Sequence, residues 1–221
     1  MSCDRDTVRK ELAGFPLQIS GDTQAKLRVI RLSGSHDAPL PEVPSGCCLI
    51  DLSVDRWNAR LSPWPAPALR GGDAFSGDGQ CTLVFLGDEL LPYLDAALGP
   101  DAEYLLAGYS LAGLFALWAG YACDCFAGVA AVSPSLWFPG WSEYTLQRRP
   151  RTRAIYLSLG DREEKTRNPI LATVGDVIRA QHRLLESEGI PSVLDWNPGN
   201  HFRDSEERTA KGITWLIHQL S

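Results

Sequence analysis

One serine in the middle of the chain stands in a context that can make its hydroxyl a nucleophile. Ser110 lies between Gly108 and Ala112, after an apolar run at residues 104–107 and before an apolar, helix-forming segment at residues 114–122. This pattern predicts a strand, a sharp turn with Ser110 at its apex and then a helix, as the nucleophile-elbow motif requires. Such a turn crowds the positions two before and two after the serine, so both must be small. A glycine-rich turn that happens to contain a serine is the alternative interpretation.

An acidic loop and a histidine loop follow, each after a predicted strand. Residues 154–160 form an apolar run typical of a buried strand, and the acidic segment 161–164 comes directly after it. Residues 191–196 form the next predicted strand, and His201 stands in the loop behind it. The order serine, acid, histidine is that of the catalytic groups in α/β-hydrolases. His201 is therefore the predicted base, because the other histidines stand in an early loop or in predicted helices: His36, His182 and His218.

Three carboxylates could orient His201, and the sequence leaves the choice among them open. Glu163 is the favoured acid, because in many α/β-hydrolases the acid stands three residues beyond a glycine that ends this strand, here Gly160. Asp161 is nearer the strand end and is the second candidate, and Glu164 is the third. The task of the acid is to hold the imidazole in place and to stabilise its protonated form.

Oxyanion donors and a substrate wall are expected around this serine. The N–H of Leu111 opens the predicted helix and is the first expected donor. The second donor is expected within residues 53–57, in the long loop that leaves the predicted strand 46–52. Four aromatic residues are candidates for substrate binding: Trp57, Trp64, Tyr109 and Trp137. Phe138 and Trp141 are further candidates for the wall, and plain packing of these aromatic side chains is the alternative.

The elements that must position these residues alternate between strand and helix. Further strands are predicted at residues 15–19, 25–32, 46–52 and 128–133, and helices at residues 82–98, 142–147, 168–188 and 205–220. Pro92 should bend or break the first of these helices, and residues 1–14 are expected to begin as a short helix or a frayed end. This alternation predicts a mostly parallel sheet with helices on both faces. Together with the order of Ser110, the acidic loop and His201, it predicts an α/β-hydrolase fold with a minimal or no cap domain. We expect a single domain over residues 1–221, with N-terminal strands and a loop in residues 1–45 and the catalytic core in residues 46–221.

Composition and charge argue against several other classes of protein. The 221 residues are 44% hydrophobic and 22% charged, which is ordinary for a globular protein. The net charge of −6 argues against nucleic acid or an anionic membrane as a partner. No segment resembles a signal peptide or a membrane helix, so we expect a cytoplasmic protein with reduced cysteines. Cys123 and Cys125 have no second ligand pair, and no nucleotide motif is present, so we expect no metal and no cofactor.

Four segments taken together resemble a known family. They are G-Y-S-L-A-G-L from Gly108, S-P-S-L-W from Ser133, L-G-D-R-E-E-K-T-R-N-P from Leu159 and P-G-N-H-F from Pro198. In this order they resemble the serine esterases of the α/β-hydrolase superfamily, in the esterase-D-like branch that includes siderophore (enterobactin-type) esterases. The resemblance covers the chain from about residue 46 onward. It implies the fold and hydrolase chemistry and says little about the substrate.

The favoured function is therefore that of a serine esterase acting on small-molecule carboxylic esters through an acyl-serine intermediate. An acyltransferase would use the same three groups with an alcohol or thiol in place of water, and a peptidase would use them on amides. A non-catalytic binding protein of the same fold is the remaining alternative, and the three complete loops argue against it. The natural substrate and the oligomeric state are left open by the sequence.

Overall fold

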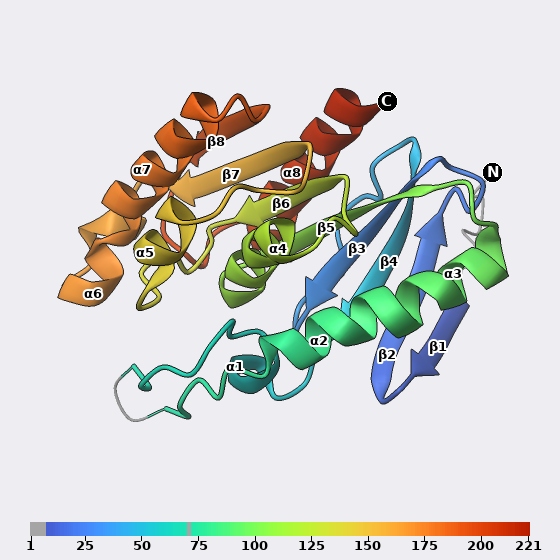
Figure 1. The fold of residues 1–221 in the computed structure, drawn as a ribbon, viewed down its shortest axis with the longest axis horizontal. Coiled ribbons are helices and arrows are strands. Elements are labelled where there is room, and N and C mark those ends of the chain that lie inside the picture. The colour runs from blue at the N-terminus through green and yellow to red at the C-terminus, as the bar shows by residue number, and fades with distance from the viewer. Residues whose placement is uncertain (1–7, 70–71) are drawn as a thin grey trace.

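Eight strands form one sheet, and this sheet positions the rest of the protein. In the computed structural model, which describes residues 8–69 and 72–221, the strand order is β1-β2-β4-β3-β5-β6-β7-β8 (Figure 1). The parallel strands are β3 (Leu27–Ser33), β4 (Cys47–Ser53), β5 (Glu103–Tyr109), β6 (Gly128–Val132), β7 (Ala154–Gly160) and β8 (Ser192–Asn197). At one edge β1 (Val8–Leu12) and β2 (Phe15–Gly21) add antiparallel pairs. The mostly parallel sheet confirms the predicted fold class.

Helices cover both faces of the sheet, as predicted. They are α1 (Trp57–Arg60), α2 (Gly79–Phe85), α3 (Leu91–Leu98), α4 (Leu111–Ala122), α5 (Trp141–Leu146), α6 (Pro169–Ala172), α7 (Val174–Ser187) and α8 (Ser205–Leu220), with a π-helical turn η1 (Leu86–Leu90) and a 3₁₀ turn η2 (Glu163–Lys165). The helices α2, α3, α4 and α7 pack into the larger apolar cluster on one face, and α8 packs into the smaller cluster on the other (Figure 1). Cys48 belongs to the first cluster and Cys47 to the second, as their alternation in β4 predicts.

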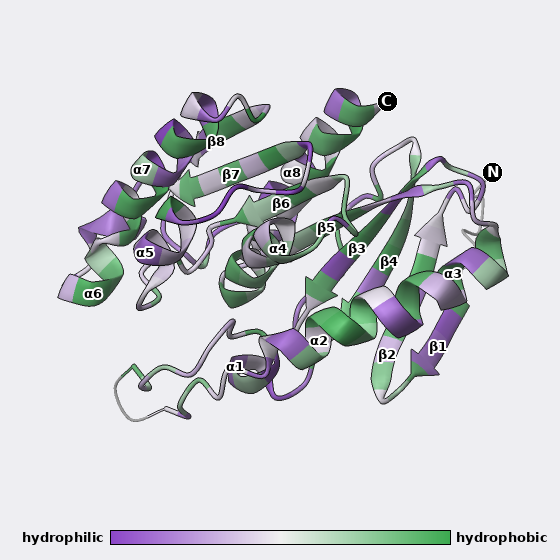
Figure 2. Ribbon diagram, in the orientation of Figure 1, coloured by the Kyte–Doolittle hydropathy of each residue, from purple (hydrophilic) through white to green (hydrophobic). Residues whose placement is uncertain are grey.

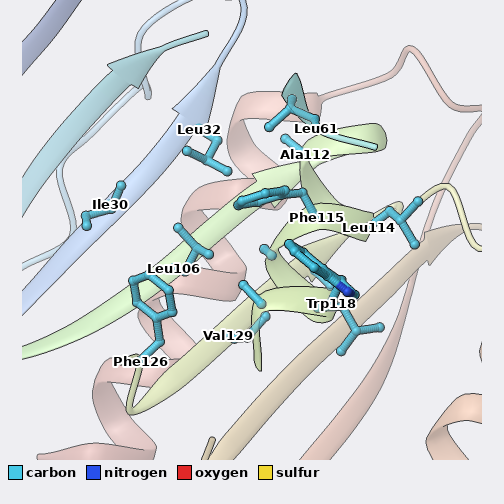
Figure 3. Close-up of a cluster of buried hydrophobic side chains, with 14 of the residues drawn as sticks. Ile30, Leu32, Leu61, Leu106, Ala112, Leu114, Phe115, Trp118, Phe126 and Val129 are labelled. Atoms are coloured by element: carbon cyan, nitrogen blue, oxygen red, sulfur yellow. The ribbon is translucent and has the colours of Figure 1, made fainter. Parts of the chain in front are cut away.

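The helix that follows Ser110 is buried along almost its whole length. Every residue of α4 from Leu111 to Tyr121 is buried, and the helix packs against β5 and β6. Phe115 and Trp118 lie in the apolar cluster with Leu106 and Val129 from these two strands (Figure 3). Burial of aromatic side chains contributes strongly to stability and resists local movement. The serine is therefore attached to one of the most rigid parts of the molecule.

The prediction for the N-terminal residues is wrong where the structure describes them. Residues 8–12 form the edge strand β1, while residues 1–7 lie outside the described residues. Ala13 and Gly14 both have positive φ, 49° and 81°, which is the backbone of a tight hairpin turn. The turn therefore pairs residues 8–12 with β2. Figure 2 shows a largely hydrophilic β1, as expected for an exposed edge strand.

Two predicted helices differ in detail from the structure. The helix expected at residues 82–98 begins at Gly79 and runs on through η1 into α3, without breaking at Pro92. Proline lacks the N–H of a regular helical turn, and the wider π-helical turn directly before α3 accommodates it. The helix expected at residues 168–188 is divided at Thr173 into α6 and α7. Its predicted start is confirmed, because the Asn168 side chain accepts hydrogen bonds from two backbone N–H groups of α6.

Candidate active site

Ser110 stands on a sharp turn between β5 and α4. Its φ of 59° and ψ of −119° are unusual for a residue with a side chain, and such strain is found at functional sites. The turn is fixed by the Ser110 N–H, which donates to the Val132 carbonyl at 3.0 Å. It leaves no room at Gly108, where an added Cβ would lie 2.3 Å from the Ala112 carbonyl oxygen. The local sequence therefore forms the predicted strand, turn and helix with the small residues where they are needed.

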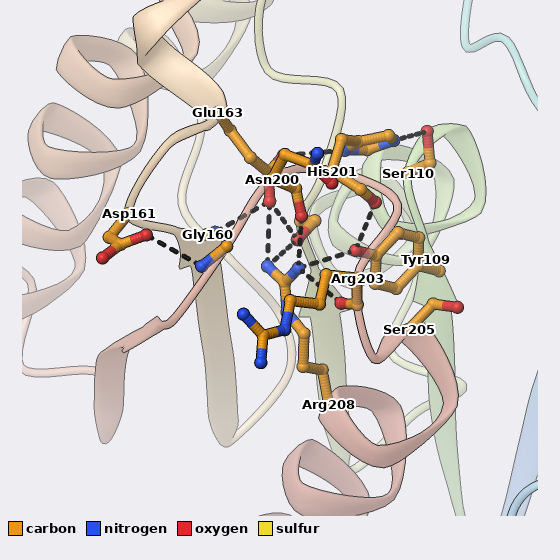
Figure 4. A network of polar contacts seen from close by, with 12 residues as sticks. Tyr109, Ser110, Gly160, Asp161, Glu163, Asn200, His201, Arg203, Ser205 and Arg208 are labelled. Atoms are coloured by element: carbon orange, nitrogen blue, oxygen red, sulfur yellow. Dashed lines mark hydrogen bonds and ion pairs between the residues drawn. The ribbon is translucent and has the colours of Figure 1, made fainter.

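A continuous chain of polar contacts leads from Ser110 to a buried carboxylate. His201 Nε2 lies 2.9 Å from Ser110 Oγ, and His201 Nδ1 lies 2.7 Å from Glu163 Oε2 (Figure 4). The three residues come from the carboxyl ends of β5, β8 and β7, which end at the same edge of the parallel sheet. The Glu163 side chain is 5% exposed and that of His201 is 32% exposed. His201 thus faces solvent while Glu163 does not.

The other two candidate acids make different contacts. Asp161 Oδ1 accepts a hydrogen bond from the Gly199 N–H at 2.8 Å, so this carboxylate ties the acidic loop to the histidine loop. Glu164 points toward α7, where both of its carboxylate oxygens bind the Arg179 guanidinium at 2.8 and 2.9 Å. Of the three carboxylates that the sequence left open, Glu163 is the one in contact with His201.

Glu163 is held by more groups than His201 alone. Its Oε1 accepts hydrogen bonds from the Gly160 N–H at 2.7 Å, Ser133 Oγ at 2.8 Å and Arg208 Nη2 at 2.8 Å. Burial by itself would raise the pKa of Glu163. The hydrogen bonds and charge of His201, together with the donors on Oε1, outweigh burial and lower the pKa to about 2. The carboxylate therefore stays ionised in all but strongly acidic solution.

Arg208 and Ser133 are site residues that the sequence analysis missed. Arg208 lies on α8, and its side chain is 3% exposed. It shares one stripe of this helix with Gly212 and Leu216, which are buried at spacings of four residues. A buried charge on such a stripe must be paired, so helical periodicity is the signal that could have identified it. Ser133 has a φ of 41° at the end of β6. It opens the S-P-S-L-W segment of the family resemblance, but no role was assigned to its hydroxyl.

Two cavities flank the contact between Ser110 and His201. The smaller has a volume of about 310 Å³ and is lined by Asp37, Trp57 and Tyr109 among others. The larger has a volume of about 590 Å³ and an apolar wall that includes Leu69, Trp137, Leu171 and Val174. Phe202 borders both cavities and is 89% exposed, which is unusual for so large an apolar side chain. The site is open, with room on both sides of the serine.

The predicted aromatic residues divide into two groups. Trp57, Tyr109 and Trp137 line the cavities beside Ser110. Trp64 does not line either of these cavities; its indole N–H donates to the Pro139 carbonyl at 2.8 Å, and its ring packs near Phe138. Phe138 and Trp141 are themselves buried in the core: both are no more than 2% exposed. The packing interpretation holds for these last three residues.

The predicted place of the second oxyanion donor assumed that residues 46–52 form the third strand, and the structure makes them the fourth. The third strand is β3, and the chain leaves it at Gly34. In α/β-hydrolases the second donor comes from the loop after the third strand. This loop borders the smaller cavity through Asp37, whereas β4 lies one strand further from β5. The first predicted donor, the N–H of Leu111, opens α4 and has no acceptor among the described residues.

The part of the chain that the structure describes offers no arrangement for a metal ion: no three His, Cys, Asp or Glu side chains gather in a suitable group. In the same residues, 8–69 and 72–221, no helix has the length and apolar character needed to cross a membrane.

The fold and the comparisons agree on the class of protein. The strand order and the helices on both faces of the sheet are those of an α/β-hydrolase. Solved structures with similar folds are a siderophore hydrolase, EstA, from Aspergillus nidulans (18% identity, TM-score 0.75, 99% of this chain and 96% of the other) and an IroE-like serine hydrolase from Shewanella oneidensis (17% identity, TM-score 0.77, 99% and 81%). The enterobactin esterase FES from Shigella flexneri is similar as well (17% identity, TM-score 0.70, 100% of this chain and 61% of the other).

A comparison of sequences gives the family. The family described as "Putative esterase" matches residues 55–204, about two thirds of the chain, so the chain belongs to this family and is an ester hydrolase. No sequence among the curated proteins matches this chain.

The low pKa of Glu163 predicts how stability depends on pH. Because the folded pKa, about 2, lies below the ordinary value of 4.5, the ionised carboxylate stabilises the folded protein above pH 4.5. This contribution, on the order of 3 kcal/mol, is lost as the pH falls from about 4.5 to about 2. A Glu163→Gln protein should therefore lose less of its free energy of unfolding over this interval, as measured by urea unfolding. Glu143→Gln, which changes an exposed carboxylate on α5, should follow the wild type. Equal acid sensitivity of the wild type and Glu163→Gln would contradict the assignment.

Proposed function

We propose that the protein hydrolyses carboxylic esters of small molecules through an acyl-serine intermediate, with Ser110 as nucleophile, His201 as base and Glu163 as the orienting acid. The observation that carries this proposal is the unbroken chain of contacts from Ser110 Oγ through His201 to Glu163, at 2.9 and 2.7 Å. An ionised carboxylate can only accept hydrogen bonds, so Glu163 requires the proton of a neutral imidazole to be on Nδ1. Nε2 is then free to accept the proton of the serine.

The steps follow from these positions. Ser110 Oγ attacks the ester carbonyl carbon as its proton passes to His201 Nε2, and the carbonyl oxygen becomes an oxyanion. The carbon–oxygen bond to the alcohol breaks, His201 returns the proton to the departing alkoxide, and the acyl group remains on Ser110. Water then attacks the acyl carbon in the same way. His201 takes a proton from the water as the water oxygen bonds to the acyl carbon. The bond from the acyl carbon to Ser110 Oγ breaks, and His201 returns the proton to Ser110.

The oxyanion is proposed to bind two backbone N–H groups. One is that of Leu111, where the positive end of α4 adds to the attraction. The other comes from the loop after β3. In this loop the Gly34 N–H donates to Asp37 Oδ2 at 2.6 Å, which leaves the N–H groups of Ser35 and His36 as the nearest donors along the chain.

The larger cavity indicates the class of substrate. Its apolar wall, with Trp137 and the exposed Phe202 at the opening, suits esters with a bulky apolar or aromatic group. Solved structures of the same fold include siderophore hydrolases and enterobactin esterases, so esters of that kind belong in the first panel of substrates. We also propose that residues 1–221 act as one domain and that the protein works in the cytoplasm, with its cysteines reduced.

The assignment of the catalytic groups predicts a graded series of losses. Ser110→Ala should abolish hydrolysis of p-nitrophenyl esters, and Glu163→Gln should lower kcat by about 10²- to 10⁴-fold, because the imidazole loses its partner. Glu164→Gln is the matched control: it changes the next residue of the same loop, whose carboxylate binds Arg179, and should keep kcat within a few-fold of the wild type. Hydrolysis by Ser110→Ala at the wild-type rate would refute the proposal, and equal effects of the two glutamate changes would refute the choice of acid.

The cavity predicts a change in substrate preference. Trp137→Ala should raise KM for esters with a bulky aromatic or long acyl group by about 10-fold or more and leave that for acetyl esters within a few-fold, since only the bulky group reaches this wall. Trp64→Ala is the control, because this indole packs away from both cavities. The measurement is kcat and KM over a series of p-nitrophenyl esters of increasing size. If Trp137→Ala changes KM equally for small and bulky esters, the larger cavity is not the acyl or aryl site.

A further inference from the structure

Arg208 lies at the centre of a buried polar network behind the candidate site (Figure 4). Its Nη2 donates to Glu163 Oε1 at 2.8 Å and also to Ser133 Oγ. Its Nη1 donates to the Tyr109 hydroxyl at 2.9 Å. The guanidinium thus contacts the loop that carries the acid, the end of β6 and the strand that leads into the elbow.

The same side chain reaches the histidine loop in two ways. Burial raises the pKa of Tyr109 to about 12, so its hydroxyl keeps its proton and donates it to the His201 carbonyl at 2.8 Å. Arg208 Nη1 also lies 3.4 Å from the Asn200 carbonyl and 3.3 Å from the Arg203 carbonyl, on either side of His201 in the chain. One cation therefore connects Glu163 with the backbone of the loop that carries His201.

This connection has the properties that precise positioning requires. A buried guanidinium is stable only when it is paired, and its planar fork fixes the direction of each bond. Arg208 and Glu163 are 3% and 5% exposed, so water does not compete strongly for either group. Since Glu163 Oε1 is held by Arg208, Ser133 and Gly160, the carboxylate cannot rotate away, and Oε2 stays directed at His201.

We propose that Arg208 is a positioning residue for the hydrolysis reaction, which holds Glu163 and the His201 loop in the geometry that activates Ser110. The inference rests on the proposed function above and assigns a role to a residue outside the three catalytic groups. Arg208 has a second effect, because its positive charge lies beside the Glu163–His201 pair. The hydrogen bond from this cation helps to lower the pKa of Glu163, so the carboxylate that orients His201 stays ionised to lower pH than it would without the guanidinium.

Other titratable groups around Arg208 do not replace this charge. Tyr109 from β5 and Tyr156 from β7 face it, and burial raises the pKa of both, so they are neutral. Glu206, in the first turn of α8, is a further acid near Tyr109, and its charge raises the pKa of this tyrosine. Its Oε2 accepts a hydrogen bond from Ser205. Lys211 of α8 is paired with Asp195 of β8. Arg208 is therefore the cation bound directly to Glu163 among the described residues.

The test is the rate at which a fluorophosphonate labels Ser110, followed by intact mass over a range of pH. It requires no knowledge of the natural substrate. Arg208→Met should lower the labelling rate constant by about 10- to 100-fold at the optimum, because Glu163 and His201 lose their fixed geometry. It should also move the acid limb of the profile to higher pH by about one unit, because the pKa of Glu163 rises when the guanidinium no longer donates to it. Arg208→Lys keeps the charge without the fork, so it should restore the acid limb and only part of the rate.

Arg179→Met is the matched control. It breaks the arginine–carboxylate pair of Glu164, the next residue of the same loop, and should leave both the rate and the profile unchanged. If Arg208→Met does not fold, Tyr109→Phe removes only the link to the His201 carbonyl and should lower the rate several-fold.

Three results would overturn the inference. Labelling of Arg208→Met, or of Tyr109→Phe, at the wild-type rate would show that the link is not needed. A loss of rate with an unmoved acid limb, equal in Arg208→Met and Arg208→Lys, would assign Arg208 a structural role alone. Failure of the wild type to label at Ser110 would instead refute the proposed function, and this inference with it.

Discussion

The buried carboxylate of Glu163 is the group on which the rest of the site depends. An ionised side chain that is 5% exposed is stable only if each oxygen is satisfied, and here one oxygen faces His201 while the other accepts from Arg208, Ser133 and Gly160. These partners come from four different parts of the chain. The hydrogen bonds to this one carboxylate therefore hold the loops of the site together at a fixed spacing.

The sheet makes this convergence possible. In a parallel sheet the carboxyl ends of neighbouring strands lie at one edge, so β5, β6, β7 and β8 deliver their loops side by side. The apolar helix α4 anchors Ser110 from one face, and α8 supplies Arg208 from the other. Each face of the sheet thus contributes to the same small set of atoms, while the cavities remain open toward solvent on both sides of Ser110.

How much the sequence could predict depended on how local each signal was. The elbow and the histidine loop are short motifs next to regular strands, so periodicity and residue type were enough to find Ser110 and His201. The acid remained one of three, because adjacent carboxylates differ only in direction, and direction is set by contacts with distant residues such as Arg179. Arg208 was missed for the same reason: the side chains that it binds are 45 to 99 residues away in the chain.

The strand order was the other limit. Residues 46–52 have the composition of a central strand. Composition alone does not give the number of strands that come before it in the chain, and one earlier strand was not predicted. The tight turn at Ala13 and Gly14 made residues 8–12 a strand and shifted the count by one. The loop after the third strand, where the second oxyanion donor is proposed, moved with it from residues 53–57 to the loop that begins at Gly34.

The central claim is that Ser110, activated by His201 and Glu163, carries the acyl group during turnover. The most direct measurement is rapid acid quenching during hydrolysis of a p-nitrophenyl ester, followed by mass spectrometry of the peptides. The account predicts one adduct with the mass of the acyl group, on the peptide that contains Ser110, formed with the first release of p-nitrophenol. Sustained turnover with no adduct on that peptide, or with the acyl group on another residue, would contradict it.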